Sequence, residues 1–318
     1  MKILDVHAGM SPRWLVAGLL AVGIVTLALG VQADERLRVI TSTPDFAAIA
    51  TEVGGDRVDV LSLAKGTQNP HFVDARPSFI VELNKADMLV EGGLELEIGW
   101  LPPLLLSARN PNLQPNAPGR VVAALNVPLL EVPTFRVDRS MGDVHPAGNP
   151  HFTLNPDNGK IVAETIAEAL IRIHPQDAAV FQANLARFKN TLDAKIQQWV
   201  TQMEPFRGTK VVSYHRSYDY FIERFGLELA STVEPKPGVP PSPAHVEALT
   251  ALMKAQGVRV VMLEPYYVRA LPDVISRETG AQVLILPTMP GGVPEVQTYV
   301  DLFQYNINAL TAALRVGQ

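Results

Sequence analysis

One long stripe of apolar residues dominates the middle of the chain. Between about residues 176 and 203 they recur at the spacing of an α-helix, as Phe181, Leu185, Phe188, Leu192 and Ile196. Pro205 and Gly208 then end the pattern. A helix of roughly 28 residues is about 42 Å long, which is enough to span a molecule of two lobes. The stripe therefore predicts a backbone helix that joins two folded halves.

Short apolar runs alternate with helical patterns on both sides of this helix. Before it, strands are expected at 37–41, 57–63, 87–90 and 121–125, and helices at 46–53, 77–85, 94–108 and 157–173. After it, strands are expected at 209–213, 227–231, 258–263 and 282–286, and helices at 217–225, 243–256, 271–280 and 297–314. This alternation predicts an α/β protein with two (β/α) lobes built on parallel-type sheets. The expected division is an N-terminal lobe at 34–174, the linking helix at 175–204 and a C-terminal lobe at 205–318.

The first 33 residues have the pattern of an export signal. Lys2 and Arg13 precede an apolar run at 14–30, and a small-x-small site ending in Ala33 follows at once. The alternative is an uncleaved anchor, but a run of 17 residues is at the lower limit for a membrane span. We therefore expect cleavage near Ala33 and a periplasmic mature protein.

The chain contains no cysteine and has a formal net charge of −5. The absence of cysteine excludes disulfides, thiolate metal sites, a cysteine nucleophile and a lipid-modified N-terminal cysteine. The acidic balance speaks against a nucleic-acid surface, so no nucleic-acid partner is expected. A transition metal, if one binds, must be held by histidine and carboxylate.

Three histidines stand out by their positions. The tetrapeptide Asn-Pro-His-Phe occurs twice, which places His71 and His151 in loops at element boundaries behind a proline that fixes the backbone. His215 follows the strand predicted at 209–213, at the carboxyl edge where open α/β sheets bind ligands. Each alone is most simply a surface or core residue, but three at comparable positions in two lobes indicate a metal site. Three imidazoles with one oxygen donor suit tetrahedral zinc, whereas manganese prefers more carboxylate oxygen.

The other histidines have simpler interpretations. His7 lies in the leader. His174 at a helix end and His245 in a helical stretch are expected to be solvated or capping residues. His145 precedes the second Asn-Pro-His by a few residues. We expect it to be an ordinary loop histidine, the alternative being a role in metal delivery.

Together these segments resemble a known family. Asn-Pro-His71, Asn-Pro-His151 with Leu154-Asn-Pro156, and Ser-Tyr-His215 with Tyr218 and Phe221 look like the metal-binding loops of zinc and manganese substrate-binding proteins of ABC importers. The resemblance implies two lobes joined by a rigid helix, with metal bound in the cleft between them by these three histidines. It implies zinc before manganese, because manganese receptors usually have a glutamate at the third position. It also implies a membrane permease, and a metallochaperone, as partners.

The fourth ligand departs from the family pattern. Many members place an aspartate after the last core strand, but here the segment 286–295 has none. Either Glu264 or Glu295 closes the site, or water completes it, and we favour Glu264 because it ends a strand at the same sheet edge. The alternative role for Glu264 is an outer carboxylate or a helix cap. The long histidine-rich loop of many zinc receptors is also missing.

Two other function classes remain open from the residues. A secreted zinc hydrolase would use three histidines and Glu264 as general base, although the chain lacks a His-Glu-x-x-His helix and a serine nucleophile elbow. A receptor for an organic solute or a chelated metal would line its cleft with tyrosines, namely Tyr214, Tyr218, Tyr220, Tyr266 and Tyr267. Ordinary packing is the simpler role for these rings.

Overall fold

The computed structural model describes residues 36–137, 142 and 144–315. The predicted signal peptide at 1–33 and its cleavage site after Ala33 lie outside the described residues. From Arg36 onward the chain forms one compact unit. The division into lobes at 34–174, 175–204 and 205–318 stays a prediction, because the contacts continue through this whole unit.

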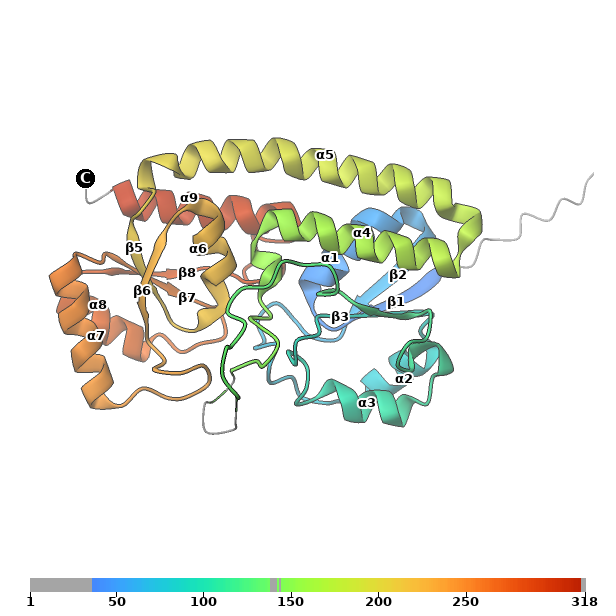
Figure 1. Ribbon diagram of the computed structural model, residues 1–318, viewed down its shortest axis with the longest axis horizontal. Helices are drawn as coiled ribbons and strands as arrows, with labels where there is room; N and C mark the ends of the chain where they lie inside the picture. Colours follow the sequence, from blue (N-terminus) through green and yellow to red (C-terminus); the bar gives the residue numbers. More distant parts are fainter. Residues whose placement is uncertain (1–35, 138–141, 143, 316–318) are drawn as a thin grey trace, which may run out of the picture. The chain divides into compact units, whose positions relative to one another are not determined.

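The first half of this unit is built on a four-stranded parallel sheet in the order β2-β1-β3-β4. Its strands are β1 (Leu37–Thr41), β2 (Val58–Ser62), β3 (Met88–Glu91) and β4 (Arg120–Val122). Its helices are α1 (Pro44–Gly54), α2 (Pro77–Lys85) and α3 (Leu101–Ala108). The α2 and α3 helices pack on one face of the sheet through a separate apolar cluster that includes Ile40, Leu83 and Leu104 (Figure 1).

The second half repeats the arrangement with a parallel sheet in the order β6-β5-β7-β8. Its strands are β5 (Lys210–Ser213), β6 (Glu228–Thr232), β7 (Val260–Leu263) and β8 (Gln282–Ile285). Its helices are α6 (Asp219–Phe225), α7 (Pro243–Gln256), α8 (Ala270–Thr279) and α9 (Tyr299–Arg315). The two sheets confirm the predicted fold class of two (β/α) lobes with parallel strands.

The long helix is also confirmed. It is α5 (Ala178–Met203), 26 residues long, and it follows α4 (Pro156–Ile173) after a break at His174-Pro175. Its buried side includes Phe181, Phe188 and Trp199. It packs against α1 and α4 of the first half and against α9 of the second, so it runs along both sheets (Figure 1). One apolar core continues beneath it from α1 to α9.

Two predicted elements differ from the structure. The helix expected at 94–108 begins only at Leu101, because Leu94 and Glu95 both have positive φ angles of 54° and 64°, which a right-handed helix excludes. The strand expected at 121–125 ends at Val122, and the chain turns directly after it. Both errors come from apolar residues that continue past the end of the regular element.

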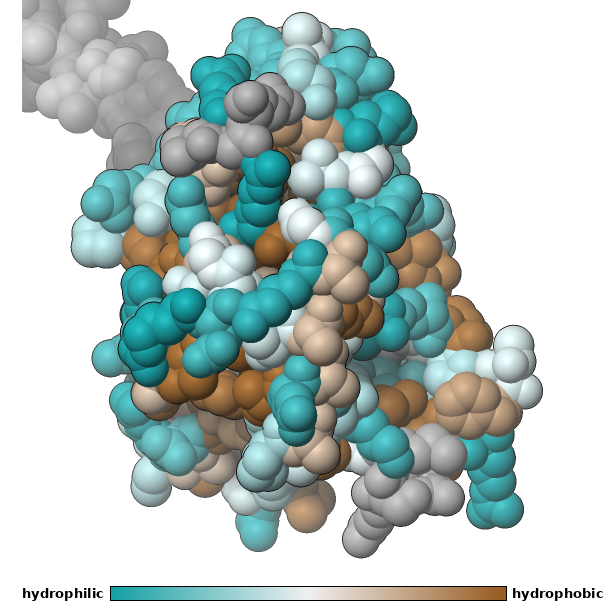
Figure 2. Space-filling model, turned by 90° about the vertical axis from the view of Figure 1, so that its left-hand side faces the viewer, coloured by the Kyte–Doolittle hydropathy of each residue, from teal (hydrophilic) through white to brown (hydrophobic). Residues whose placement is uncertain are grey.

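The outer face of the C-terminal lobe shows apolar patches among hydrophilic residues (Figure 2). A groove of about 650 Å³ lies between α7 and α8 and is lined by Val246, Leu271, Val274 and charged side chains. Its lining contains no histidine. No helix among the described residues has the length and apolar character needed to span a membrane.

Candidate metal centre

His71 lies in the loop between β2 and α2 and is held from two sides. The side-chain Oδ1 of Asn69 accepts a hydrogen bond from the backbone N–H of His71 at 3.0 Å, which closes an Asx turn. The indole Nε1 of Trp100 donates to the carbonyl of Pro70 at 2.9 Å. The first Asn-Pro-His motif is therefore a fixed turn that aims the imidazole.

The second copy of the motif forms the same turn. Asn149 Oδ1 accepts the backbone N–H of His151 at 2.9 Å, and a 3-10 turn (Phe152–Leu154) leads from there into α4. Asn149 also binds the segment beyond β5, because its Nδ2 donates to the carbonyl of Arg216 at 2.8 Å. The backbone that presents His151 is thus connected to the backbone that presents His215.

His215 comes two residues after the end of β5 and directly before a 3-10 turn (Arg216–Tyr218) that opens α6. Since β5 is an inner strand of its sheet, the imidazole stands at the carboxyl edge of the sheet, where ligands of such folds bind. The expected placement of His215 is therefore observed.

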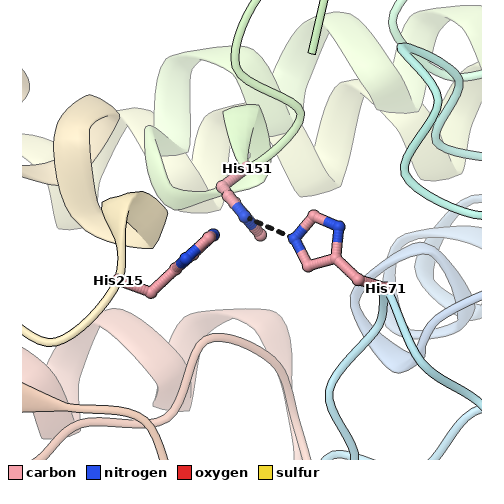
Figure 3. Close-up of side chains that lie close together, drawn as sticks. All are labelled: His71, His151 and His215. Carbon is pink, nitrogen blue, oxygen red and sulfur yellow. Dashed lines mark hydrogen bonds between the residues drawn. The ribbon is translucent and has the colours of Figure 1, made fainter. Parts of the chain in front are cut away.

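The structure brings the three imidazoles together. Their ligand atoms all lie within 4.8 Å of one another, and each of the three residues is buried. The Nε2 atoms of His71 and His151 are 3.2 Å apart, and the ring of His215 lies 5.4 Å from each of the other two, between centroids. Figure 3 shows the three rings converging from three separate segments of the chain. This arrangement suits one shared cation.

The electrostatics favour the form of the rings that binds metal. Burial, and next the neighbouring imidazoles, lower the pKa of His71 and His151 well below the usual 6.5. Both rings are therefore neutral at pH 7 and keep a nitrogen lone pair for a cation.

Glu234 is a member of the candidate site that the sequence analysis missed. Its Oε2 lies 2.8 Å from Nδ1 of His215, and both side chains are buried. A carboxylate on one imidazole nitrogen orients the ring and leaves the other nitrogen for a metal. Glu234 stands at the start of the proline-rich segment 234–243. One general signal could have pointed to it: a metal-ligating histidine usually has a carboxylate or a carbonyl at its second ring nitrogen.

Comparisons with known proteins agree with this geometry. The family model described as "Zinc-uptake complex component A periplasmic", ZnuA, matches residues 39–313. The chain belongs to this family.

The individual relatives share less than a third of their residues with this chain. A high-affinity zinc uptake system protein of Paracoccus denitrificans is 27% identical over 93% of this chain and 97% of its own length. The corresponding protein of Brucella abortus is 28% identical over 52% of this chain, and the chain spans about half the length of that relative, 48%. Two solved structures share the fold: ZnuA (TM-score 0.74, 24% identity, 88% of this chain and 99% of that one) and FpvC of Pseudomonas aeruginosa with Mn²⁺ (0.75, 23%, 89% and 100%).

The carboxylates expected to complete a ZnuA-type site are not part of the cluster. Among the described residues, the group within 4.8 Å contains the three histidines and neither Glu264 nor Glu295. Glu264 follows β7, is fully buried, and its two carboxyl oxygens lack a hydrogen-bond partner among the described residues. Burial raises the pKa of Glu264 to about 7. Glu295 is exposed in the loop before α9. Glu264 as the fourth ligand stays a prediction.

The remaining described histidines fall into two groups. His174 and His245 contact other partners: Nδ1 of His174 lies 2.9 Å from Asp177 Oδ2, and Nε2 of His245 lies 3.1 Å from the carbonyl of Thr232. His145, by contrast, stacks on His71 with 5.1 Å between ring centroids. Its position beside the cluster was not expected of an ordinary loop histidine.

Proposed function

We propose that this chain binds one divalent metal ion, zinc foremost, through His71, His151 and His215, and delivers it to an ABC importer. The observation that supports the proposal best is the convergence of three buried imidazoles from two facing lobes. Burial lowers the pKa of two of them, His71 and His151, well below the usual value. Membership of the ZnuA family supplies the context of zinc uptake.

The chemistry of the donors favours zinc over manganese. Zinc is bound by imidazole nitrogen in tetrahedral sites, whereas manganese prefers carboxylate and water oxygen. The cluster offers three nitrogens and, among the described residues, no carboxylate within the group. Relatives of this fold have been solved with Mn²⁺ and with Ni²⁺. Binding of several divalent ions in vitro is therefore expected, in the Irving–Williams order.

The compartment and partners follow from the family description. The family description is that of a periplasmic component of a zinc-uptake complex. For the present chain we propose a membrane permease that receives the metal, with a metallochaperone as a further partner. Export requires the signal at 1–33, so the mature protein should begin at Asp34. Mass spectrometry of the mature chain tests that start directly.

The other function classes find no support at the site. The family consists of binding components of an importer rather than enzymes, which argues against a zinc hydrolase. Two of the five tyrosines proposed for an organic solute are bound to the framework instead: Tyr218 donates to the carbonyl of Leu286 at 2.5 Å and Tyr220 donates to that of Asn149 at 2.9 Å.

Calorimetry with purified protein tests the metal site. The protein should bind one zinc ion, and His71→Ala, His151→Ala and His215→Ala should each weaken binding by tenfold or more, about 1.4 kcal/mol. His245→Ala is the matched control, because this imidazole contacts Thr232 and should leave binding unchanged. Unchanged zinc affinity in the three variants of the cluster would show that these histidines do not bind the metal.

Metal analysis of protein isolated from its own compartment, without added metal, tests the choice of ion. Zinc at about one equivalent is the expected result. A strain that lacks the chain should grow poorly in zinc-depleted medium and recover when zinc is added. Recovery with manganese but not with zinc would contradict the proposal.

A further inference from the structure

Among the described residues, the three-histidine cluster supplies three of the four ligands that a tetrahedral ion needs. A structural zinc site uses four protein ligands, and a site with three leaves the fourth to water or to another donor. Glu264 and Glu295 lie outside the group of converging atoms. Another donor near the cluster therefore needs to be identified.

A cavity of about 370 Å³ leads to the cluster and shows what is available. Three histidines line this cavity: His151 and His215 of the cluster, and His145. Glu264 does not line this cavity. His145 is the one imidazole in this lining that does not belong to the three-histidine cluster. Other polar side chains of the lining already have partners, since Asn149 and Arg216 both contact Glu131.

The ring of His145 is close to the cluster and well oriented. It stacks on His71 with 5.1 Å between centroids and 28° between ring planes. Its Nε2 atom is buried and has no hydrogen-bond partner among the described residues. An unpaired nitrogen inside a protein costs free energy unless something binds it.

The backbone carbonyl of Leu94 lies close to the imidazole of His145. A ring that faces a backbone carbonyl on one side and has an unpartnered Nε2 resembles a metal-ligating histidine, whose second nitrogen usually faces a carbonyl or a carboxylate.

The backbone at Leu94 has a conformation of unfavourable free energy. Leu94 has φ 54° and Glu95 has φ 64°, a left-handed pair that non-glycine residues rarely adopt. Such strain persists where the surrounding structure requires it and is common at binding sites. Here the strained turn places the Leu94 carbonyl against His145.

We propose that His145 supplies the fourth metal ligand through Nε2, so that the ion is bound by four imidazoles. The inference rests on the proposed function, because it concerns the same metal ion. His145 is not a member of the group within 4.8 Å, so ligation requires its ring to shift toward the other three. The cavity beside it provides the space for that shift.

X-ray absorption spectroscopy at the zinc edge tests the proposal on the full mature protein. The wild type loaded with one zinc should show four imidazole ligands, and His145→Ala and His145→Gln should each show three with one added oxygen donor. Zinc affinity of both variants should fall on the order of tenfold or more, since even outer partners of a ligand are worth 10- to 100-fold. His245→Gln is the matched control and should keep four imidazoles.

Glu264→Gln separates this proposal from the carboxylate alternative. Four imidazoles and unchanged affinity in Glu264→Gln support ligation by His145. Three imidazoles in the wild type, or an unchanged zinc spectrum in both His145 variants, would overturn it. A wild type that binds no zinc would overturn the proposed function itself, which is a different outcome. Equal thermal unfolding of the zinc-free proteins establishes that each variant is folded.

Discussion

The carboxylate of Glu234 connects the imidazole of His215 to the loop that follows Glu234. Its Oε2 lies 2.8 Å from Nδ1 of His215 and also accepts the backbone N–H of Gly238 at 2.9 Å. Gly238 has φ 72°, a conformation that glycine adopts without cost, so the turn can bring its N–H to the carboxylate. The loop therefore fixes the carboxylate, and the carboxylate fixes the tautomer and direction of the imidazole.

Replacing Glu234 by alanine should weaken zinc binding by about 10- to 100-fold, because the ring of His215 loses its orienting partner and some of its basicity. Competition with a chelator of known affinity measures this change. Glu295→Gln, an exposed carboxylate before α9, is the control and should bind like the wild type. Equal affinities for the two variants would show that Glu234 has no influence on the metal.

Asn149 should matter more than Asn69, although both stand at the same position of the repeated motif. Asn69 makes the turn bond to His71. Asn149 makes the equivalent bond to His151 and also donates to Glu131 at 3.0 Å and to the carbonyl of Arg216. Its loss leaves the buried N–H of His151 unpaired, at about 1–3 kcal/mol, and also removes two partly buried hydrogen bonds.

Urea unfolding of Asn149→Ala and Asn69→Ala compares the two positions. Asn149→Ala should lower the free energy of unfolding by about 2 kcal/mol or more, and Asn69→Ala by about 1 kcal/mol. Zinc affinity should fall further in Asn149→Ala, because two of the three histidines lose their common support. Similar losses in both variants would mean that the additional bonds of Asn149 contribute nothing.

The phenylalanines of the two motifs differ in the same way. Phe152 is 0% exposed and lies 6.0 Å from the ring of Phe46, between centroids, whereas Phe72 is 66% exposed. Phe152→Ala should lower the free energy of unfolding by about 3–5 kcal/mol, as is usual for a buried aromatic side chain. Phe72→Ala should change it by no more than about 0.5 kcal/mol. Calorimetric melting of the zinc-free proteins measures the difference. Equal melting temperatures for the two variants would contradict the prediction.

Most of the fold was predictable because each element has a clear local signal. The strand β1 is a short apolar run, and α2 and α7 begin at prolines that suit the first helical turn. The stripe of α5 could be read over its whole length. The start of α3 was missed because the apolar residues after Gly93 continue a helical pattern, while the backbone at Leu94 and Glu95 is left-handed.

The site was predictable only for residues whose type and position in the sequence indicate metal binding. Histidines at loop positions behind strands indicated His71, His151 and His215. Glu234 escaped because its contact with His215 joins the ends of two neighbouring strands, β5 and β6, and no local pattern encodes that contact. His145 was undervalued for a similar reason: its stacking on His71 joins segments that lie far apart in the sequence.

Glu97 should make the stability of the zinc-free protein depend on pH. Its carboxyl group is buried, and its Oε1 accepts hydrogen bonds from Ser42 Oγ and from the backbone N–H of Gly92, both at 2.7 Å. Burial raises the pKa of Glu97 from 4.5 to about 7. Between these two values the folded chain binds a proton that the unfolded chain has released, so the free energy of unfolding falls as the pH rises.

The variant Glu97→Gln removes this titration and keeps an oxygen for both hydrogen bonds. Relative to the wild type it should therefore gain stability from pH 4.5 to pH 7, by up to ~3 kcal/mol. Urea unfolding at several pH values in the presence of a chelator measures the difference without a contribution from bound metal. Glu168→Gln, an exposed carboxylate on α4, should leave the pH dependence of the wild type intact. Parallel curves for Glu97→Gln and the wild type would mean that Glu97 titrates in the folded protein as it does in the unfolded chain.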